Sequence, residues 1–256
     1  MIRMIVTDLD GTYLRNDKSV SEYTRRVTAE ARKQGVLFVV ATARPIRSVV
    51  VRLPDVQFDV GIFHNGAVMR TPEGDIYGAG IFGPDIIARR ILSGIPGSNI
   101  SVESEDVLYC NYDSLRVWPG EPYTYTEDFA CVEGKVADKL IVEAHSHEEA
   151  RRISEYIPDY AYTQLSENRI AMIMNKKATK LNAIRMVAEK YGISMDEVVA
   201  FGDDYNDIDM LKGCGRGIAV ANALDEVKLA ADEVCGGNME DGEARWIAEH
   251  VLGSAD

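Results

Sequence analysis

The chain of 256 residues is short of positive charge: 28 Lys and Arg stand against 41 Asp and Glu, which leaves a net charge of −13. Nucleic acids and anionic membranes bind proteins through patches of Lys and Arg, and the sequence contains no block of basic residues. We therefore expect neither a nucleic acid nor a membrane as a partner. If the substrate is an anion, its charge must be met locally by a metal ion, a single lysine or a helix N-terminus.

Long apolar runs and paired cysteines are also missing. No stretch approaches the ~20 apolar residues of a membrane-spanning helix, and the first residues lack the three regions of a signal peptide. The four cysteines are widely spaced without any C-x-x-C pair, which favours thiols in a reducing compartment over a disulfide or zinc framework. These absences predict a cytoplasmic location.

Strands and helices alternate over both ends of the chain. The apolar content of 46% is that of a soluble globular protein, and the length is sufficient for two domains. Apolar runs predict buried strands at residues 1–6, 36–41, 58–69, 76–81, 198–201 and 217–220, and His64–Gly66 interrupts the run at 58–69. Because amphipathic helices separate most of these strands, we expect an α/β fold, with a Rossmann-like doubly wound parallel sheet formed by residues 1–82 and 172–256.

The middle of the chain has a different pattern. In residues 83–171, short strands mix polar and apolar positions, and two helices lie among them. This pattern is typical of an antiparallel sheet. We therefore expect residues 83–171 to form an inserted α+β cap domain.

The first predicted strand ends in two acidic residues, Asp8 and Asp10, followed by Gly11. Side chains alternate along a strand, so the two carboxylates lean to the same side where the chain leaves the sheet. Two carboxylates this close repel each other unless a cation or a shared proton lies between them. A turn of the Asx type that closes the strand is the structural alternative.

Other predicted element ends in the parallel region also carry chemically capable residues: Thr42, Lys180, Asp203, Asn206 and Asp207. Each has a structural alternative, since Thr42, Asn206 and Asp207 suit helix starts and a lone lysine is usually solvated. The carboxyl ends of parallel strands share one edge of the sheet, however, so these residues are expected to converge there.

The combined set suits phosphoryl transfer. Mg2+ prefers oxygen ligands, which Asp8, a backbone carbonyl near Asp10 and Asp203 can supply. Lys180, Thr42 and backbone amides can hold a phosphate dianion beside these acids. An aspartate is also a competent nucleophile, and a second aspartate two residues on can act as acid and base.

Four motifs carry a resemblance to a known family. They are Asp8–Thr12, Thr42–Arg44, Lys180 and Gly202–Asp207, which resemble motifs I to IV of the haloacid dehalogenase superfamily. The order, the spacing and the insertion between the second and third motifs resemble the Cof-type sugar-phosphatase branch, which has a C2-type cap. His64–Ala67, Ala221–Ala223 and Glu240–Gly242 also resemble that branch.

The resemblance implies a role for each motif residue. Asp8 would be the nucleophile, Asp10 the general acid and base, and Thr42 and Lys180 the phosphate ligands, while Asp8, Asp10 and Asp203 would hold the metal. Asn206 and Asp207 would orient the metal shell and Lys180. Lys176 and Lys177 lie close enough in the sequence to be alternatives to Lys180.

We therefore expect a Mg2+-dependent phosphomonoester hydrolase that acts on small phosphorylated metabolites, such as sugar or polyol phosphates, through an aspartyl-phosphate. A phosphoglycolate-type phosphatase, a phosphomutase or another phosphotransferase on the same core are the alternatives. The cap is expected to select the substrate. The sequence gives no indication of the oligomeric state.

Overall fold

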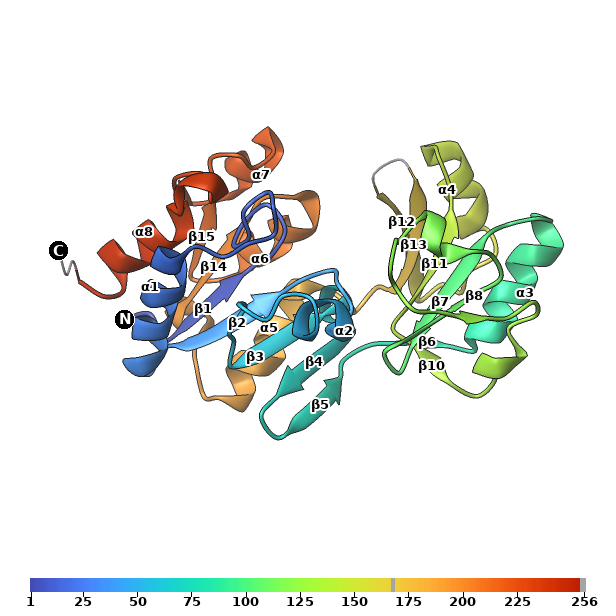
Figure 1. The fold of residues 1–256 in the computed structure, drawn as a ribbon, viewed down its shortest axis with the longest axis horizontal. Helices are drawn as coiled ribbons and strands as arrows, with labels where there is room; N and C mark the ends of the chain where they lie inside the picture. Colours follow the sequence, from blue (N-terminus) through green and yellow to red (C-terminus); the bar gives the residue numbers. More distant parts are fainter. Residues whose placement is uncertain (167–168, 254–256) are drawn as a thin grey trace. The chain divides into compact units, whose positions relative to one another are not determined.

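The computed structural model describes residues 1–166 and 169–253, which fall into two compact units (Figure 1). The first unit contains Met1–Gly78 and the chain from Thr179 onward. The second unit is Ala79–Ala178, so it is inserted into the first.

The first unit is built on an eight-stranded sheet with the strand order β16-β15-β14-β1-β2-β3-β4-β5. Neighbouring strands are parallel from β16 to β3, and the β3–β4 and β4–β5 pairs are antiparallel. The strands are β1 (Met4–Thr7), β2 (Leu37–Ala41), β3 (Val60–Phe63), β4 (Val68–Thr71), β5 (Gly74–Tyr77), β14 (Val198–Gly202), β15 (Arg216–Ala219) and β16 (Glu233–Val234). β1 and β14 are far apart in the sequence but are neighbours in the sheet. Their pairing brings together the loop that carries Asp8 and the loop that carries Asp203.

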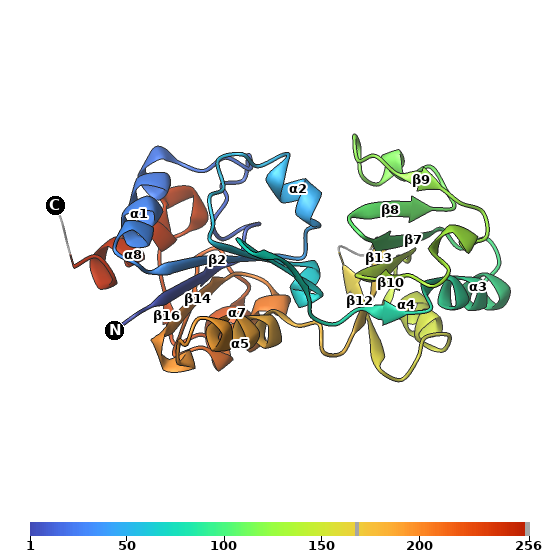
Figure 2. The same ribbon diagram turned by 90° about the horizontal axis from the view of Figure 1, so that it is seen from below.

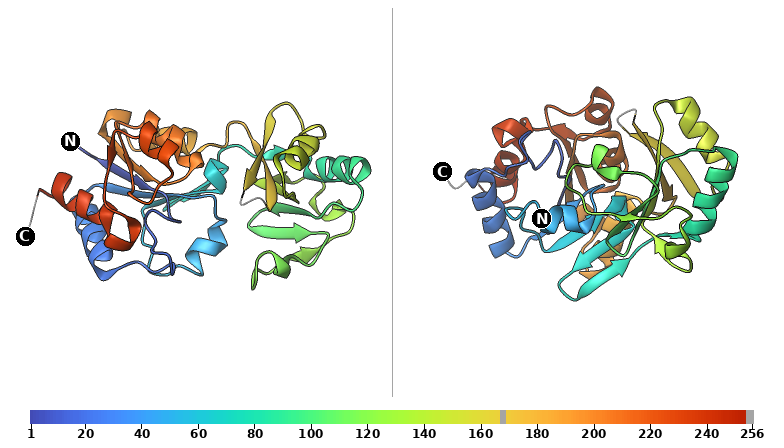
Figure 3. Two further views of the ribbon diagram at one scale, coloured as in Figure 1. Left: turned by 90° about the horizontal axis from the view of Figure 1, so that it is seen from above. Right: turned by 45° about the vertical axis from the view of Figure 1, so that its right-hand side comes forward.

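Helices cover both faces of this sheet. They are α1 (Glu22–Lys33), α2 (Ile46–Val50), α5 (Lys180–Lys190), α6 (Ile208–Gly213), α7 (Asp225–Ala230) and α8 (Gly242–His250). Figure 2 shows α1 and α8 on one face and α5 and α7 on the other, and α1 and α5 are again on opposite faces in the left view of Figure 3. The predicted doubly wound α/β core is confirmed.

Alternation along the strands provides each face with its own apolar core. Met4 and Val6 of β1 point toward the face where Ile184 and Val187 of α5 pack. On the other face, the Phe201 ring of β14 meets the Trp246 ring of α8 edge-on at a centroid distance of 5.3 Å. Burial of both faces explains why the parallel strands read as continuous apolar runs.

Local capping signals fix where the key helices begin. The Thr179 side chain accepts a hydrogen bond from the backbone N–H of Asn182, which makes Lys180 the first residue of α5. Ser194 and Glu197 form a capping box immediately before β14.

The expected strand at residues 76–81 is wrong. The chain pairs with β4 only as far as Tyr77, and the next strand, β6 (Ile81–Phe82), pairs with β10 (Val136–Ala137) of the second unit. Two glycines, Gly78 and Gly80, separate the two strands, and glycine weakens a strand because it contributes no side chain to packing. The apolar positions therefore belong to two different sheets.

The second unit has a six-stranded sheet with the order β12-β13-β11-β7-β8-β9, antiparallel except for the β8–β9 pair. Its strands are β7 (Ile100–Ser104), β8 (Val107–Cys110), β9 (Thr124–Tyr125), β11 (Lys139–Glu143), β12 (Ala161–Ser166) and β13 (Ile170–Asn175). Helices α3 (Pro84–Gly94) and α4 (His147–Ser154) pack through Ile91 and Ile153 onto one apolar core with this sheet.

Among the described residues, none of the helices has both the length and the apolar character required to span a bilayer. The four cysteines all lie in the described parts of the chain, and none of them forms a disulfide.

Candidate active site

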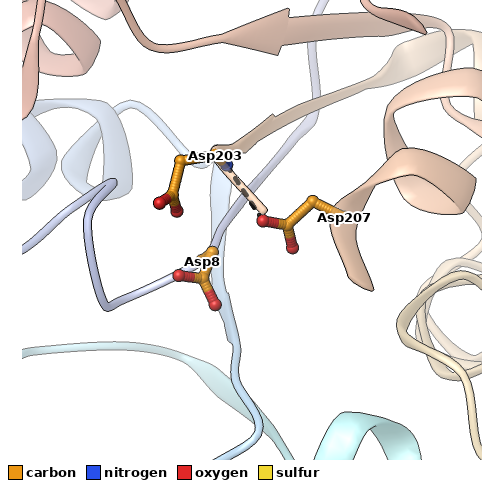
Figure 4. A group of neighbouring side chains, drawn as sticks. All are labelled: Asp8, Asp203 and Asp207. Carbon is orange, nitrogen blue, oxygen red and sulfur yellow. Dashed lines mark hydrogen bonds between the residues drawn. The ribbon is translucent and has the colours of Figure 1, made fainter. Parts of the chain in front are cut away.

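The acidic loops after β1 and β14 meet at the carboxyl edge of the parallel sheet. Thr7 pairs in register with Phe201, and the backbone N–H of Asp8 donates to the Phe201 carbonyl at 3.0 Å. Both strands end within two residues of this pair, so that Asp8 follows β1 and Asp203 follows β14. The carboxylates of Asp8, Asp203 and Asp207 point toward one another, with one oxygen of each within 4.8 Å of the others (Figure 4).

Lys180 lies inside this acidic cluster. Its Nζ is 2.6 Å from Oδ1 of Asp8 and 2.7 Å from Oδ1 of Asp207, and the residue is 2% exposed. Burial favours the neutral amine, but the charges of Asp207 and Asp8 outweigh it, so the pKa of Lys180 is raised overall. The lysine is therefore a fixed positive charge at the centre of the site.

Asp207 is fully engaged by the protein. Its Oδ1 accepts from Lys180, and its Oδ2 accepts from the backbone N–H groups of Asp203 and Asp204 at 2.9 and 3.1 Å. Asp204 accepts from the N–H of Tyr205 and forms a capping box with Asp207. Asp207 thus holds both the lysine and the loop that carries Asp203.

The loop after β1 approaches Asp203 closely. The Thr12 hydroxyl donates to Oδ1 of Asp203 at 2.7 Å. Gly11 has a φ of +84°, and a Cβ at this position would lie 2.3 Å from Oδ2 of Asp203. Only glycine accommodates both this backbone conformation and this contact. Burial raises the pKa of Asp203 to about 6, against the hydrogen bond from Thr12.

The cluster has an excess of negative charge. Asp8 is 7% exposed, and burial raises its pKa to about 8, with the charges of Asp207 and Asp203 acting in the same direction and Lys180 against it. Three carboxylates thus face one ammonium group in a poorly hydrated site. Carboxylate oxygens are the ligands that a hard divalent cation prefers, so Asp8 and Asp203 are suited to hold one.

The carboxylate of Asp10 lies in a separate basic cluster. Arg44 donates to it from two nitrogens, with Nη2 2.7 Å from Oδ1, and Nζ of Lys18 is also 2.7 Å from Oδ1. Burial opposes the ionised form, but the hydrogen bonds from Arg44 and Lys18 hold the pKa of Asp10 below its ordinary value. Asp10 is therefore ionised, and its side chain is turned to these cations.

Thr42 and Asn206 are held by hydrogen bonds at neighbouring loops. Thr42 follows β2 and is 1% exposed, and its hydroxyl accepts from the backbone N–H of Arg44 at 3.1 Å. Asn206 donates from Nδ2 to Oδ1 of Asn65 at 3.1 Å, which joins the loop after β14 to the loop after β3.

The structure thus brings four of the sequence-predicted residues into direct contact or close proximity: Asp8, Lys180, Asp203 and Asp207. The alternative lysine Lys176 is outside this cluster, because its Nζ donates to the Asp159 carbonyl of the second unit. Thr12 and Asn65 lie within the motifs Asp8–Thr12 and His64–Ala67, but the sequence did not indicate their contacts, and it gave no signal for Lys18. The motif position of Arg44 was the available signal for that residue.

Comparison with known proteins places this geometry in a family context. The sequence model of the haloacid dehalogenase-like hydrolase family matches residues 5–247 of this chain. The 5-amino-6-(5-phospho-D-ribitylamino)uracil phosphatase YitU of Bacillus subtilis is 27% identical over 262 residues, which cover 96% of this chain and 97% of YitU. YcsE of Bacillus subtilis, a phosphatase named for the same substrate, is 28% identical over 276 residues, which cover 98% of this chain and 96% of YcsE. The crystal structure of TM0651 from Thermotoga maritima superposes with a TM-score of 0.86 at 27% identity, over 100% of this chain and 99% of that one.

Proposed function

Since the chain belongs to the haloacid dehalogenase-like hydrolase family and is a phosphatase of that family, we propose that it hydrolyses small phosphomonoesters with a divalent metal ion and an aspartyl-phosphate intermediate. The observation that carries the proposal is the direct contact of Lys180 with Asp8 beside Asp203. This reaction requires a nucleophile, a fixed positive charge and a carboxylate that can help to hold a metal ion, all within one site.

The acidic cluster fits a Mg2+ ion. Asp207 has both oxygens engaged in hydrogen bonds, so Asp8 and Asp203 would hold the ion with their side chains, and Asp10 would contribute through its backbone carbonyl. When bound, the ion polarises the phosphoryl oxygens and neutralises negative charge that develops on them. Its positive charge would also keep Asp8 ionised despite burial.

In the first step, an oxygen of Asp8 attacks the phosphorus atom. The bond from phosphorus to the ester oxygen breaks, and the leaving oxygen takes a proton from Asp10. Lys180 balances negative charge beside Asp8, and Thr42 with backbone N–H groups of the loop after β1 would hold the phosphoryl oxygens.

In the second step, a water molecule gives a proton to Asp10 and attacks the phosphorus. The bond between phosphorus and Asp8 breaks, which releases inorganic phosphate and regenerates the Asp8 carboxylate. The ion pair with Arg44 and Lys18 keeps Asp10 ionised, which is the state in which it can accept a proton. For the acid role in the first step, Asp10 must carry a proton, so its carboxyl group has to leave these cations.

A small cytosolic sugar or polyol phosphate is the substrate class we propose. YitU and YcsE act on a phosphorylated ribityl group, which is a polyol phosphate, and both cover nearly the whole of this chain. We assign substrate selection to the inserted unit, Ala79–Ala178, because it lies outside the unit that carries the acids. Several of its polar residues are already used structurally: Asn111 accepts from the Ile100 N–H, and Arg116 pairs with Glu143.

The test is release of inorganic phosphate from an aryl phosphate and from a panel of phosphorylated metabolites, with and without Mg2+. Asp8→Asn should abolish Mg2+-dependent release while the circular dichroism spectrum stays that of the wild type. The matched control is Asp209→Asn, a substitution on the exposed side of α6. Turnover retained by Asp8→Asn would remove the nucleophile assignment, and phosphate found only on an acceptor sugar would identify a phosphotransferase.

A further inference from the structure

A further buried acid, Glu243, lies outside the acidic cluster and contacts the end of the strand that precedes the nucleophile. Glu243 is the second residue of α8 and is 3% exposed. Its Oε2 is 2.7 Å from Oγ1 of Thr7, the last residue of β1, and its Oε1 is buried without a hydrogen-bond partner in the described part of the chain. The same Thr7 hydroxyl is 2.7 Å from the backbone carbonyl oxygen of Asp8.

The protonation state of Glu243 follows from the number of hydrogen atoms available for the two contacts of the Thr7 hydroxyl. A threonine hydroxyl has one hydrogen, so it cannot donate to both oxygens at 2.7 Å. The Asp8 carbonyl can only accept. Both short contacts are therefore hydrogen bonds only if Glu243 is a carboxylic acid, whose O–H donates to Thr7 while Thr7 donates to Asp8.

The surroundings of Glu243 agree with a neutral group. No basic side chain in the described residues forms an ion pair with it. The titratable groups that interact with it electrostatically are Asp8 of the loop after β1, Tyr13 of the same loop and Cys235 before α8, and none of these is a cation. Burial raises the pKa of Glu243 to about 8, and the charge of Asp8 acts in the same direction, against the hydrogen bond with Thr7.

We propose that Glu243 is a positioning residue that works as a neutral carboxylic acid: its proton orients the Thr7 hydroxyl onto the Asp8 carbonyl and so fixes the peptide that carries the nucleophile. The consequence for catalysis rests on the proposed function of Asp8. The Asp8 carbonyl also accepts from the Tyr13 N–H at 3.2 Å, so the relay from Glu243 and the turn after β1 hold the same atom. Chains of hydrogen bonds of this kind reinforce one another.

Loss of the Glu243 proton reverses the relay. The Thr7 hydroxyl then donates to the carboxylate and leaves the Asp8 carbonyl, and a second negative charge is buried behind the site. We expect kcat to fall as the pH rises through this ionisation. Glu243→Gln keeps a donor for Thr7 without a titratable proton, so this variant should lack that decline.

The first measurement is independent of activity. Infrared difference spectra at neutral pH between the wild type and Glu243→Gln should contain the band of a protonated carboxylic acid, and this band should convert to carboxylate on titration to alkaline pH. Glu249→Gln, a substitution at an exposed position of the same helix, should show no such band. A carboxylate band at neutral pH in the Glu243 difference spectrum would overturn the proposal, even if the protein is an active phosphatase.

The second measurement separates positioning from mere filling of space. Glu243→Ala should lower kcat by about tenfold or more with little change in KM, and Glu243→Gln should restore most of it, because the amide again donates to Thr7. Equal loss in both variants, or an alkaline decline of kcat that Glu243→Gln retains, would overturn the positioning role. If the wild type releases no phosphate at all, the proposed function fails, while the infrared result still decides the state of Glu243.

Discussion

The ammonium nitrogen of Lys180 lies 2.6 Å from Oδ1 of Asp8, although 172 residues separate them in the chain. The contact is made because β1 ends at Thr7, next to Asp8, and α5 begins at Lys180, just after the inserted unit in the sequence. Both charged groups are buried, and Asp207 shares the same lysine at 2.7 Å. One positive charge therefore holds together the two acidic loops on which the proposed chemistry depends.

Removal of this charge should destabilise the fold strongly. Lys180→Met leaves the buried carboxylates of Asp8 and Asp207 without a cation, and breaking a buried ion pair on one side costs about 3–5 kcal/mol. Denaturant unfolding in a chelating buffer measures this loss. The control is Lys190→Met at the exposed end of α5, where loss of a solvent-exposed pair with Glu73 should lower stability far less. Equal stability of Lys180→Met and the wild type would show that the lysine does not balance the acids.

Much of this cluster could be predicted from the sequence. Asp8, Asp203 and Lys180 stand at element ends, and parallel strands bring their carboxyl ends to one edge whatever the loops do in detail. The regular alternation of apolar runs and amphipathic helices likewise predicted the parallel α/β core. The strand expected at 76–81 was wrong, since two glycines divide it between two sheets. The apolar run at 58–69 forms two antiparallel strands, β3 and β4, on either side of the turn His64–Gly66.

The contacts that tune the site could not be predicted. Arg44 reaches Asp10, and Asn206 reaches Asn65, through loop conformations and side-chain rotamers that no periodic pattern encodes. Asn65 itself has a φ of +55°, which depends on its tertiary surroundings. Glu243 looks like an ordinary acid in the first turn of a helix, where acids are common, and its burial depends on how α8 packs on the sheet.

Substitution of Gly11 should impair the site, and Gly35, which has a similar φ, provides the control. Gly11→Ala and Gly35→Ala both place a side chain at a positive φ, +84° and +87°, which costs about 1–2 kcal/mol in each case. At Gly35 the new Cβ meets nothing within 4 Å, whereas at Gly11 it lies 2.3 Å from Oδ2 of Asp203. We therefore expect Gly11→Ala alone to lose phosphatase activity, by at least tenfold in kcat. Steady-state kinetics of both variants, with thermal unfolding to match their stabilities, provide the comparison. Equal activity of the two variants would contradict the close approach at Asp203.

The stability of the protein should depend on pH through Glu243. Its pKa is raised from an ordinary value of 4.5 to about 8 by burial, so the folded chain holds the proton more tightly than the unfolded chain. The stabilisation is complete below pH 4.5, declines between 4.5 and about 8, and is lost above that, at up to about 1.4 kcal/mol per pH unit. Relative to Glu243→Gln, the wild type should therefore lose stability as the pH rises from 5 to 8. Denaturant unfolding of both proteins at each pH gives this difference, and a difference that stays constant would rule out the raised pKa.

If Asp8 and Asp203 hold one divalent ion in the cluster that Asp207 completes, calorimetric titration of the metal-free protein with Mg2+ should detect this ion. We expect one ion bound per chain in the wild type and at least tenfold weaker binding in Asp203→Asn, with unchanged binding in Asp209→Asn. Absence of Mg2+ binding in the wild type, or equal binding in the wild type and Asp203→Asn, would contradict this expectation.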